Sequence, residues 1–100
     1  MTDPSDAVLL VAIVEMAPGH ADEGRTYEDT VLQLLARHNG AVERRMRRTD
    51  SDDEVHVIRF GSRAGYESFL VDPDRVELRA KLGDAAPTTR VLEVRDLSPG

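Results

Sequence analysis

The sequence contains no cysteine and no tryptophan, and only 4% of its 100 residues are aromatic. Without cysteine the chain can form neither disulfides nor thiolate metal sites, which fits the reducing cytoplasm in which we expect the protein to act. With so few rings it is poorly suited to stacking the bases of single-stranded nucleic acid. No apolar run is long enough to cross a membrane, and the start, "MTDPSDA", lacks the basic region of a signal peptide. We therefore expect a soluble protein that is not exported.

Positive charge is also scarce, because 19 acidic residues outnumber 13 basic ones and give a net charge of −6. Affinity for nucleic acid depends on neutralising phosphates, so we expect no nucleic-acid partner. The one basic run is "ERRMRR" at 43–48. In a strand its charges would alternate between two faces. This indicates a solvated sheet margin whose arginines pair with nearby acids, in "TDSDDE" or at Glu93 or Asp96, and an anion site is the alternative.

Apolar periodicity and turn residues predict a single domain over residues 7–97, with disordered ends at 1–6 and 98–100. The first helix ends at "HNG", where Gly40 suits a left-handed cap. Ser62 and Asp72 are expected helix caps, and Pro73 suits a first helical position. The predicted strands are 8–16, 41–48, 55–60 and 88–97, and the predicted helices cover about 24–38 and 62–82, the latter interrupted by "DPD" at 72–74.

This order, β-α-β-β-α-β, is typical of the α+β ferredoxin-like fold, in which two helices cover one face of a four-stranded antiparallel sheet. The first strand, "VLLVAIV" at 8–14, has no polar side chain on either face. Two helices can cover only one of those faces, and burying one large aliphatic side chain stabilises a protein by roughly 1.5–3 kcal/mol. A bare apolar face of this kind marks an interface. We therefore predict a homodimer in which two sheets pack face to face.

Three stretches carry a family resemblance: "VLLVAIVEMAPGHADE", "HNGAVERRM" and "VHVIRFGSRAGYESFLVDPDR". In the last, a strand ends in Arg-Phe and is followed by a Ser-capped helix with an aromatic residue and then by Asp-Pro. The chain resembles the dimeric α/β-barrel superfamily over residues 7–97, in particular its antibiotic-biosynthesis-monooxygenase-like small domains. The resemblance implies a dimeric α/β barrel with a cavity between the sheet and the helices.

The same resemblance implies monooxygenase, isomerase or haem-handling activity, but this chain departs from those patterns. The monooxygenases tend to use a Trp and an Asn near the substrate, and haem-degrading relatives use an Asn–Trp–His set. This chain has no Trp, and its one Asn, Asn39, falls in a predicted turn. No phosphate cradle for a flavin is present. We therefore expect no cofactor, and the superfamily's activities do not transfer residue by residue.

His56 is the strongest candidate among the polar residues, because it lies in a strand expected to face the helices and shares its face with Ile58 and Phe60. Arg59 falls on the opposite face of that strand and is a candidate anion contact. The alternatives are a half-buried, hydrogen-bonded histidine and an arginine paired with a carboxylate. The spacing of His20, His38 and His56 fits no metal motif, so we expect no metal site.

Further candidates come from the first strand and the two helices. Glu15 follows the face of Leu9, Val11 and Ile13, and a carboxylate at the rim of an apolar cavity can act as a base. Tyr27 lies on the apolar stripe of the first helix, eleven residues before His38 and therefore on about the same helical face. The second helix contributes two ligand-contact candidates, Tyr66 and Phe69. The alternatives are a solvated strand end and core aromatics.

Two hypotheses of function follow. The favoured one is a dimeric α/β-barrel protein that binds a small hydrophobic or aromatic metabolite. The alternative is a cofactor-independent monooxygenase or isomerase acting on an aromatic or polyketide-like compound, with His56, Glu15 and Tyr27 as candidate catalytic residues. An apolar cavity with titratable groups of shifted pKa favours the enzyme, and a filled core favours a binding or interaction module.

Overall fold

The computed structural model describes residues 6–98. Residues 1–5 and 99–100, which belong to the ends predicted to be disordered, lie outside the described residues. The elements are β1 (Val8–Glu15), α1 (Ala21–Gln33), η2 (Leu34–His38), β2 (Gly40–Arg47), β3 (Glu54–Phe60), α2 (Arg63–Leu70), α3 (Pro73–Leu82), η3 (Gly83–Ala85) and β4 (Thr88–Val94). No helix within residues 6–98 is both long and apolar enough to cross a membrane.

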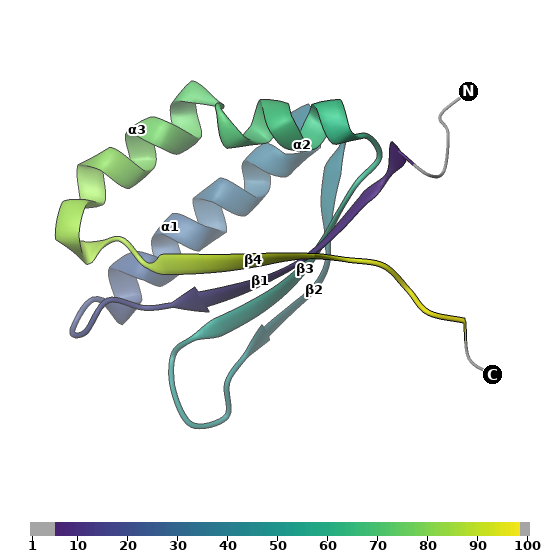
Figure 1. The fold of residues 1–100 in the computed structure, drawn as a ribbon. Coiled ribbons are helices and arrows are strands. Elements are labelled where there is room, and N and C mark those ends of the chain that lie inside the picture. Colours follow the sequence, from purple (N-terminus) through teal and green to yellow (C-terminus); the bar gives the residue numbers. More distant parts are fainter. Residues whose placement is uncertain (1–5, 99–100) are drawn as a thin grey trace.

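The four strands form one antiparallel sheet in the order β2-β3-β1-β4, and the helices lie together on one side of it (Figure 1). This confirms the α+β ferredoxin-like arrangement predicted from the order of elements. The most apolar strand, β1, lies inside the sheet between β3 and β4. One face of β1 therefore lies at the middle of the sheet beneath the helices. The other lies at the middle of the opposite, helix-free side of the sheet, which we call the open face.

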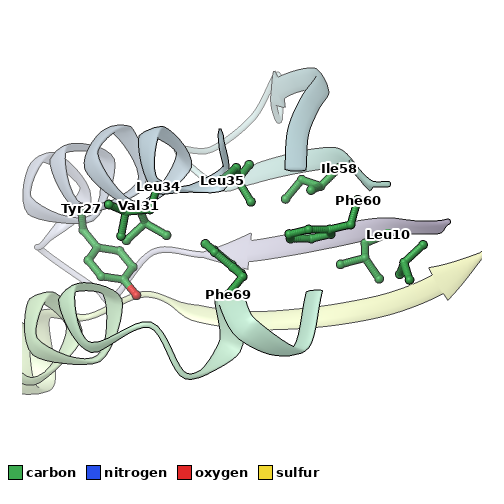
Figure 2. Close-up of a cluster of buried hydrophobic side chains, with 9 residues drawn as sticks. Leu10, Tyr27, Val31, Leu34, Leu35, Ile58, Phe60 and Phe69 are labelled. Atoms are coloured by element: carbon green, nitrogen blue, oxygen red, sulfur yellow. The ribbon is translucent and has the colours of Figure 1, made fainter. Parts of the chain in front are cut away.

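The core lies between the sheet and α1, η2 and α2 (Figure 2). On β1 the buried side chains are Val8, Leu10, Ala12 and Val14, which alternate with half-buried residues of the open face. β3 alternates in the same way, and Phe60 at its end is fully buried against the rings of Tyr66 and Phe69. The core cluster contains Val8, Leu10, Tyr27, Val31, Leu34, Leu35, Ile58, Phe60 and Phe69.

Capping residues separate α2 from α3, as the sequence predicts. The Ser62 hydroxyl accepts a hydrogen bond from the backbone N–H of Gly65 at 3.1 Å, which satisfies a donor in the first turn of α2. The Asp72 carboxylate accepts one from the backbone N–H of Asp74 at 2.9 Å, and Pro73 occupies the start of α3. The break lets α3 turn and pack along α1.

The end of the first helix differs from the expectation. The α-helix ends at Gln33, and a 3₁₀ segment continues to His38. The left-handed residue is Asn39, with φ 59°, and not Gly40, which already belongs to β2. Gly40 is needed for a different reason: a Cβ there would lie 2.8 Å from the Phe60 ring. Asparagine tolerates the left-handed region better than most residues, so it makes the turn while glycine allows the close approach.

A β-bulge in β2 takes Glu43 out of the predicted alternation, whereas Arg44 to Arg47 alternate as predicted. Val42 pairs with Ile58 and Arg44 pairs with Val57, so Glu43 is the extra residue between them. Beyond the bulge, Arg45 lies opposite His56 on the helix side of the sheet, and Met46 lies opposite Val55 on the open face. At the far edge of the sheet, β4 ends at Val94, three residues before the predicted end at 97.

Candidate functional site

A cavity of about 200 Å³ lies between the helix side of the sheet and the three α-helices. Its polar lining includes groups from α1, α2, α3 and β3, and most of the wall is apolar. The main apolar lining residues are Leu10, Ala12, Val14, Val31, Ile58 and Phe60. Four of these, Leu10, Val31, Ile58 and Phe60, belong to the core cluster labelled in Figure 2, so the cavity borders that core. α3 lies over it without contributing a buried residue.

Four residues proposed from the sequence meet in this cavity. Tyr27, His56, Tyr66 and Phe69 all line it, although they come from α1, β3 and α2. His56 is only 2% exposed and lies opposite Ala12 of β1, directly beneath the helices. The cavity therefore brings one imidazole and two phenol groups to an apolar wall.

Two proposed residues lie elsewhere. Glu15 is exposed at the end of β1, on the side of the strand that carries Leu9, Val11 and Ile13, and that side is the open face. Arg59 also lies on the open face, where its Nε donates to Glu43 at 3.0 Å and its guanidinium lies 3.7 Å from Asp96. Because the sheet separates both residues from the cavity, they cannot act on the same ligand as His56 within one subunit.

An ion-pair network centred on the buried Glu54 carboxylate supports His56. The Arg45 guanidinium donates two hydrogen bonds to the Glu54 carboxylate, at 2.7 and 3.2 Å, and a third to Asp29 at 2.6 Å. His56 Nε2 lies 2.8 Å from Glu54 Oε1, and a carboxylate only accepts, so Nε2 carries the proton. Burial alone would raise the pKa of Glu54, but the hydrogen bonds from Arg45 and His56 outweigh it and lower that pKa.

Glu28 is the functional candidate that the sequence interpretation missed. It lines the cavity from α1 and is only 5% exposed. Burial, reinforced by the negative charge of Glu54, raises its pKa to about 7, although the positive charges of Arg45, Arg75 and Arg79 act in the opposite direction. The signal was present in the sequence: Glu28 lies three residues before Val31, on the apolar stripe of the helix.

A carboxyl group with a pKa near neutral, facing an apolar cavity, can accept a proton from a bound molecule or return one to it. His56 is a second polar group at the cavity wall, and its hydrogen bond to Glu54 fixes its ring and its tautomer. Within residues 6–98, no group of three histidine or acidic side chains is placed to hold a metal ion. The carboxyl, imidazole and phenol groups of the cavity wall can take part in hydrogen bonding, and the Glu28 carboxyl can also exchange a proton.

His38 belongs to a different polar cluster, outside the cavity wall. Its Nδ1 lies 2.7 Å from the Ser68 hydroxyl and its Nε2 lies 2.5 Å from the Asp72 carboxylate, which also receives Arg37 at 3.3 Å. The hydrogen bond from His38 is the largest cause of the lowered pKa of Asp72. The cluster joins η2 to α2 and to the start of α3. Tyr27 and His38, expected on about the same helical face, are thus divided between the cavity and this junction.

The four-stranded antiparallel sheet with helices on one face is the α+β ferredoxin-like fold, and several solved structures share it. A provisionally assigned antibiotic biosynthesis monooxygenase from Bacteroides thetaiotaomicron is 13% identical, with a TM-score of 0.75 over 98% of this chain and 96% of that one. SnoaB, a cofactor-independent oxygenase from Streptomyces nogalater, is 18% identical, with a TM-score of 0.69 over 95% and 99%.

PA3566 from Pseudomonas aeruginosa is 12% identical, with a TM-score of 0.78 over 96% of this chain and 99% of that one. No protein-family model matches the sequence, and no curated protein matches it. At identities this low, the similarity establishes the shared fold and nothing about the reaction.

Proposed function

We propose that the cavity binds a small hydrophobic molecule with one or two aromatic rings. The observation that carries this proposal is a partly open cavity of about 200 Å³ with mostly apolar walls, into which titratable groups converge. An apolar cavity of roughly 150 Å³ already accepts benzene in another protein, so the size suits a ligand of this class. Tyr27 and Tyr66 add aromatic surface and hydroxyl groups that can orient it.

The alternative function, a cofactor-independent oxygenase or isomerase, is favoured by the buried Glu28 carboxyl at the cavity wall, where burial raises its pKa to about 7. A base of that strength suits removal of a proton from an enolisable or phenolic substrate. In an isomerase the proton would return to another carbon of the substrate anion. In an oxygenase the substrate anion would react with dioxygen. The similarity in fold to SnoaB supports this alternative loosely, and Trp and Asn do not line the cavity here.

Ligand binding is tested by filling the cavity. Ala12 lies on β1 and lines the cavity, so Ala12→Leu places a larger side chain in the ligand's space. The matched control is Ala64→Leu, at an exposed position of α2. We expect one- and two-ring aromatics such as 1-naphthol to raise the melting temperature of the wild type and of the control, but not of Ala12→Leu. If none of them raises the wild-type melting temperature, the binding function is wrong.

We also propose that the protein is a homodimer formed by the open face. That face presents aliphatic side chains from all four strands: Leu9, Val11, Ile13, Met46, Val55, Val57, Leu92 and Val94. Leu92 and Val94 are 40% and 37% exposed in the single chain. Charges of both signs, from Glu43, Arg44, Arg59 and Asp96, lie around these residues, so the surface is complementary to a second copy of itself.

The dimer is tested with Leu92→Asp, which puts a charge beside Val11 on an edge strand and leaves the helix-side core untouched. The control is Val71→Asp, because Val71 is 73% exposed between α2 and α3. Sedimentation should give a dimer for the wild type and the control, and a monomer for Leu92→Asp. Circular dichroism should show that the Leu92→Asp monomer is folded. A wild-type monomer at high concentration would rule out the proposed assembly.

A further inference from the structure

Two arginines stand one helical turn apart on the cavity wall contributed by α3. Arg75 and Arg79 both line the cavity, and their positive charges act on Glu28. The Arg75 guanidinium lies 5.2 Å from the centre of the Phe69 ring, and its NH1 donates to the Leu70 carbonyl at 3.1 Å. Arg79 donates to the Pro87 carbonyl at 2.9 Å. Both side chains are thus held in position by neutral partners.

The neutral partners of Arg75 and Arg79 distinguish them from arginines elsewhere in the structure. Arg45, Arg59 and Arg63 each pair directly with a carboxylate. For Arg75 and Arg79, no carboxylate of the described residues 6–98 lies within salt-bridge distance. A guanidinium has five N–H donors, and the bond to a backbone carbonyl uses one of them in each case. One end of an otherwise apolar cavity therefore offers two positive charges and several donors.

We propose that the ligand of this cavity is an aromatic carboxylic acid, bound with its carboxylate against Arg75 and Arg79 and its ring against Tyr66 and Phe69. This inference rests on the proposed binding function and names the class of ligand. Arginine is the residue best shaped to bind a carboxylate, because its parallel N–H groups match the two oxygens. The Phe69 ring beneath Arg75 keeps one face of the guanidinium away from water, which strengthens its attraction for an anion.

Glu28 makes the binding of such an anion depend on pH. Its protonated carboxyl can donate a hydrogen bond to the ligand's carboxylate, whereas its ionised form repels it. The other charged or titratable groups around Glu28 are Glu54 and His56 of β3, Arg45 of β2, Arg75 and Arg79 of α3, and the phenols Tyr27 and Tyr66. Affinity should therefore fall as the pH rises through the range in which Glu28 ionises. Substitution of Glu28 separates its contribution from that of His56.

The test compares 1-naphthoate with its neutral isostere 1-naphthamide by isothermal titration calorimetry at pH 6. The variant is Arg75→Gln/Arg79→Gln, and the matched control is Arg47→Gln/Arg95→Gln, whose residues are exposed and outside the cavity wall. Charge-assisted hydrogen bonds contribute enough to change an affinity by about tenfold or more. We expect naphthoate to bind the wild type and the control at least about tenfold more tightly than naphthamide, and the cavity variant to lose that preference.

The outcomes distinguish this inference from the function on which it rests. If naphthamide binds as tightly as naphthoate and the cavity variant changes neither affinity, the aromatic site remains and the carboxylate is wrong. If neither compound binds to any of the proteins, the proposed function itself fails. The affinity of Glu28→Gln for naphthoate should be nearly the same at pH 6 and pH 8. The affinity of the wild type for naphthoate should fall between pH 6 and pH 8. A Gln variant that keeps the full wild-type pH dependence would exclude Glu28 as its source.

Discussion

Glu28 and Glu54 are two buried carboxyl groups that influence each other, yet the protein shifts their pKa values in opposite directions. Glu28 is 5% exposed and Glu54 is 2% exposed, so depth of burial does not explain the difference. Glu54 receives hydrogen bonds from Arg45 and His56, whereas burial and the charge of Glu54 dominate the environment of Glu28. The local hydrogen bonds decide whether a buried carboxyl is a fixed structural anion or a titrating group, and here both lie beside one cavity.

The largest effect is expected when Glu54 loses its partner. Arg45→Met keeps an unbranched apolar stem but removes the guanidinium, which leaves the buried Glu54 carboxylate with only His56. Breaking a buried ion pair typically costs about 3–5 kcal/mol. Urea denaturation at pH 7 should show a loss of about 3 kcal/mol in the free energy of unfolding. Arg48→Met is the control, because the pair of Arg48 and Asp50 is exposed. Such pairs contribute no more than about 1 kcal/mol, so equal losses in the two variants would contradict the role of Arg45.

A smaller effect of opposite sign is expected when Glu28 can no longer ionise. Its pKa is about 7 in the folded protein and 4.5 in the unfolded chain, so the folded state binds more protons between these values. The Glu28 contribution to stability therefore declines as the pH rises from about 4.5 to 7 and then stays constant. Glu28→Gln removes this decline, so at pH 8 the variant should be more stable than the wild type by about 2–3 kcal/mol.

This effect is measured by urea denaturation of the wild type and of Glu28→Gln at pH 4 and pH 8. The quantity compared is the difference in their free energies of unfolding at each pH. Glu67→Gln, at an exposed position of α2, is the control and should give the same difference from the wild type at both pH values. A difference between Glu28→Gln and the wild type that does not grow with pH would mean that Glu28 ionises as an ordinary surface acid does.

The smallest effect concerns the outer end of the same network. Asp29 accepts a hydrogen bond from Arg45 at 2.6 Å, but its side chain is 53% exposed. Exposed ion pairs contribute roughly 0.2–1 kcal/mol, so Asp29→Asn should lower the free energy of unfolding by less than about 1 kcal/mol. A loss as large as that of Arg45→Met would show that Asp29, and not the pair with Glu54, holds Arg45 in place.

The sequence predicted the fold well because the relevant signals are local. Ser62, Asp72 and Pro73 specify where helices begin, and the apolar runs specify the strands and their order. The cavity was predictable only in part. His56 could be assigned to the face of Ile58 and Phe60 by simple alternation, and the structure places it at the cavity.

The remaining features depend on contacts between distant parts of the chain. Both faces of β1 are apolar, so alternation could not reveal which face the helices cover. The position of Glu15 on the open face could therefore not be predicted. An acid such as Glu28 is usually solvated on a helix, and only the packing of α3 over α1 encloses it. With Glu43 present, Arg45 lies on the side of Glu54 only because the bulge takes up the extra residue. That bulge depends on the register of two strands.

That bulge has a consequence for how this strand can change in length. Because the extra residue is unpaired, deleting Glu43 straightens β2 and leaves Arg45 and Met46 on the sides they now occupy. Removing Arg45 or Met46 would instead turn the rest of the strand over, and loss of Arg45 would bring the apolar Met46 to the buried Glu54. Insertions and deletions in homologous chains should therefore collect at this position, where the sheet can absorb them without disturbing the neighbouring cavity.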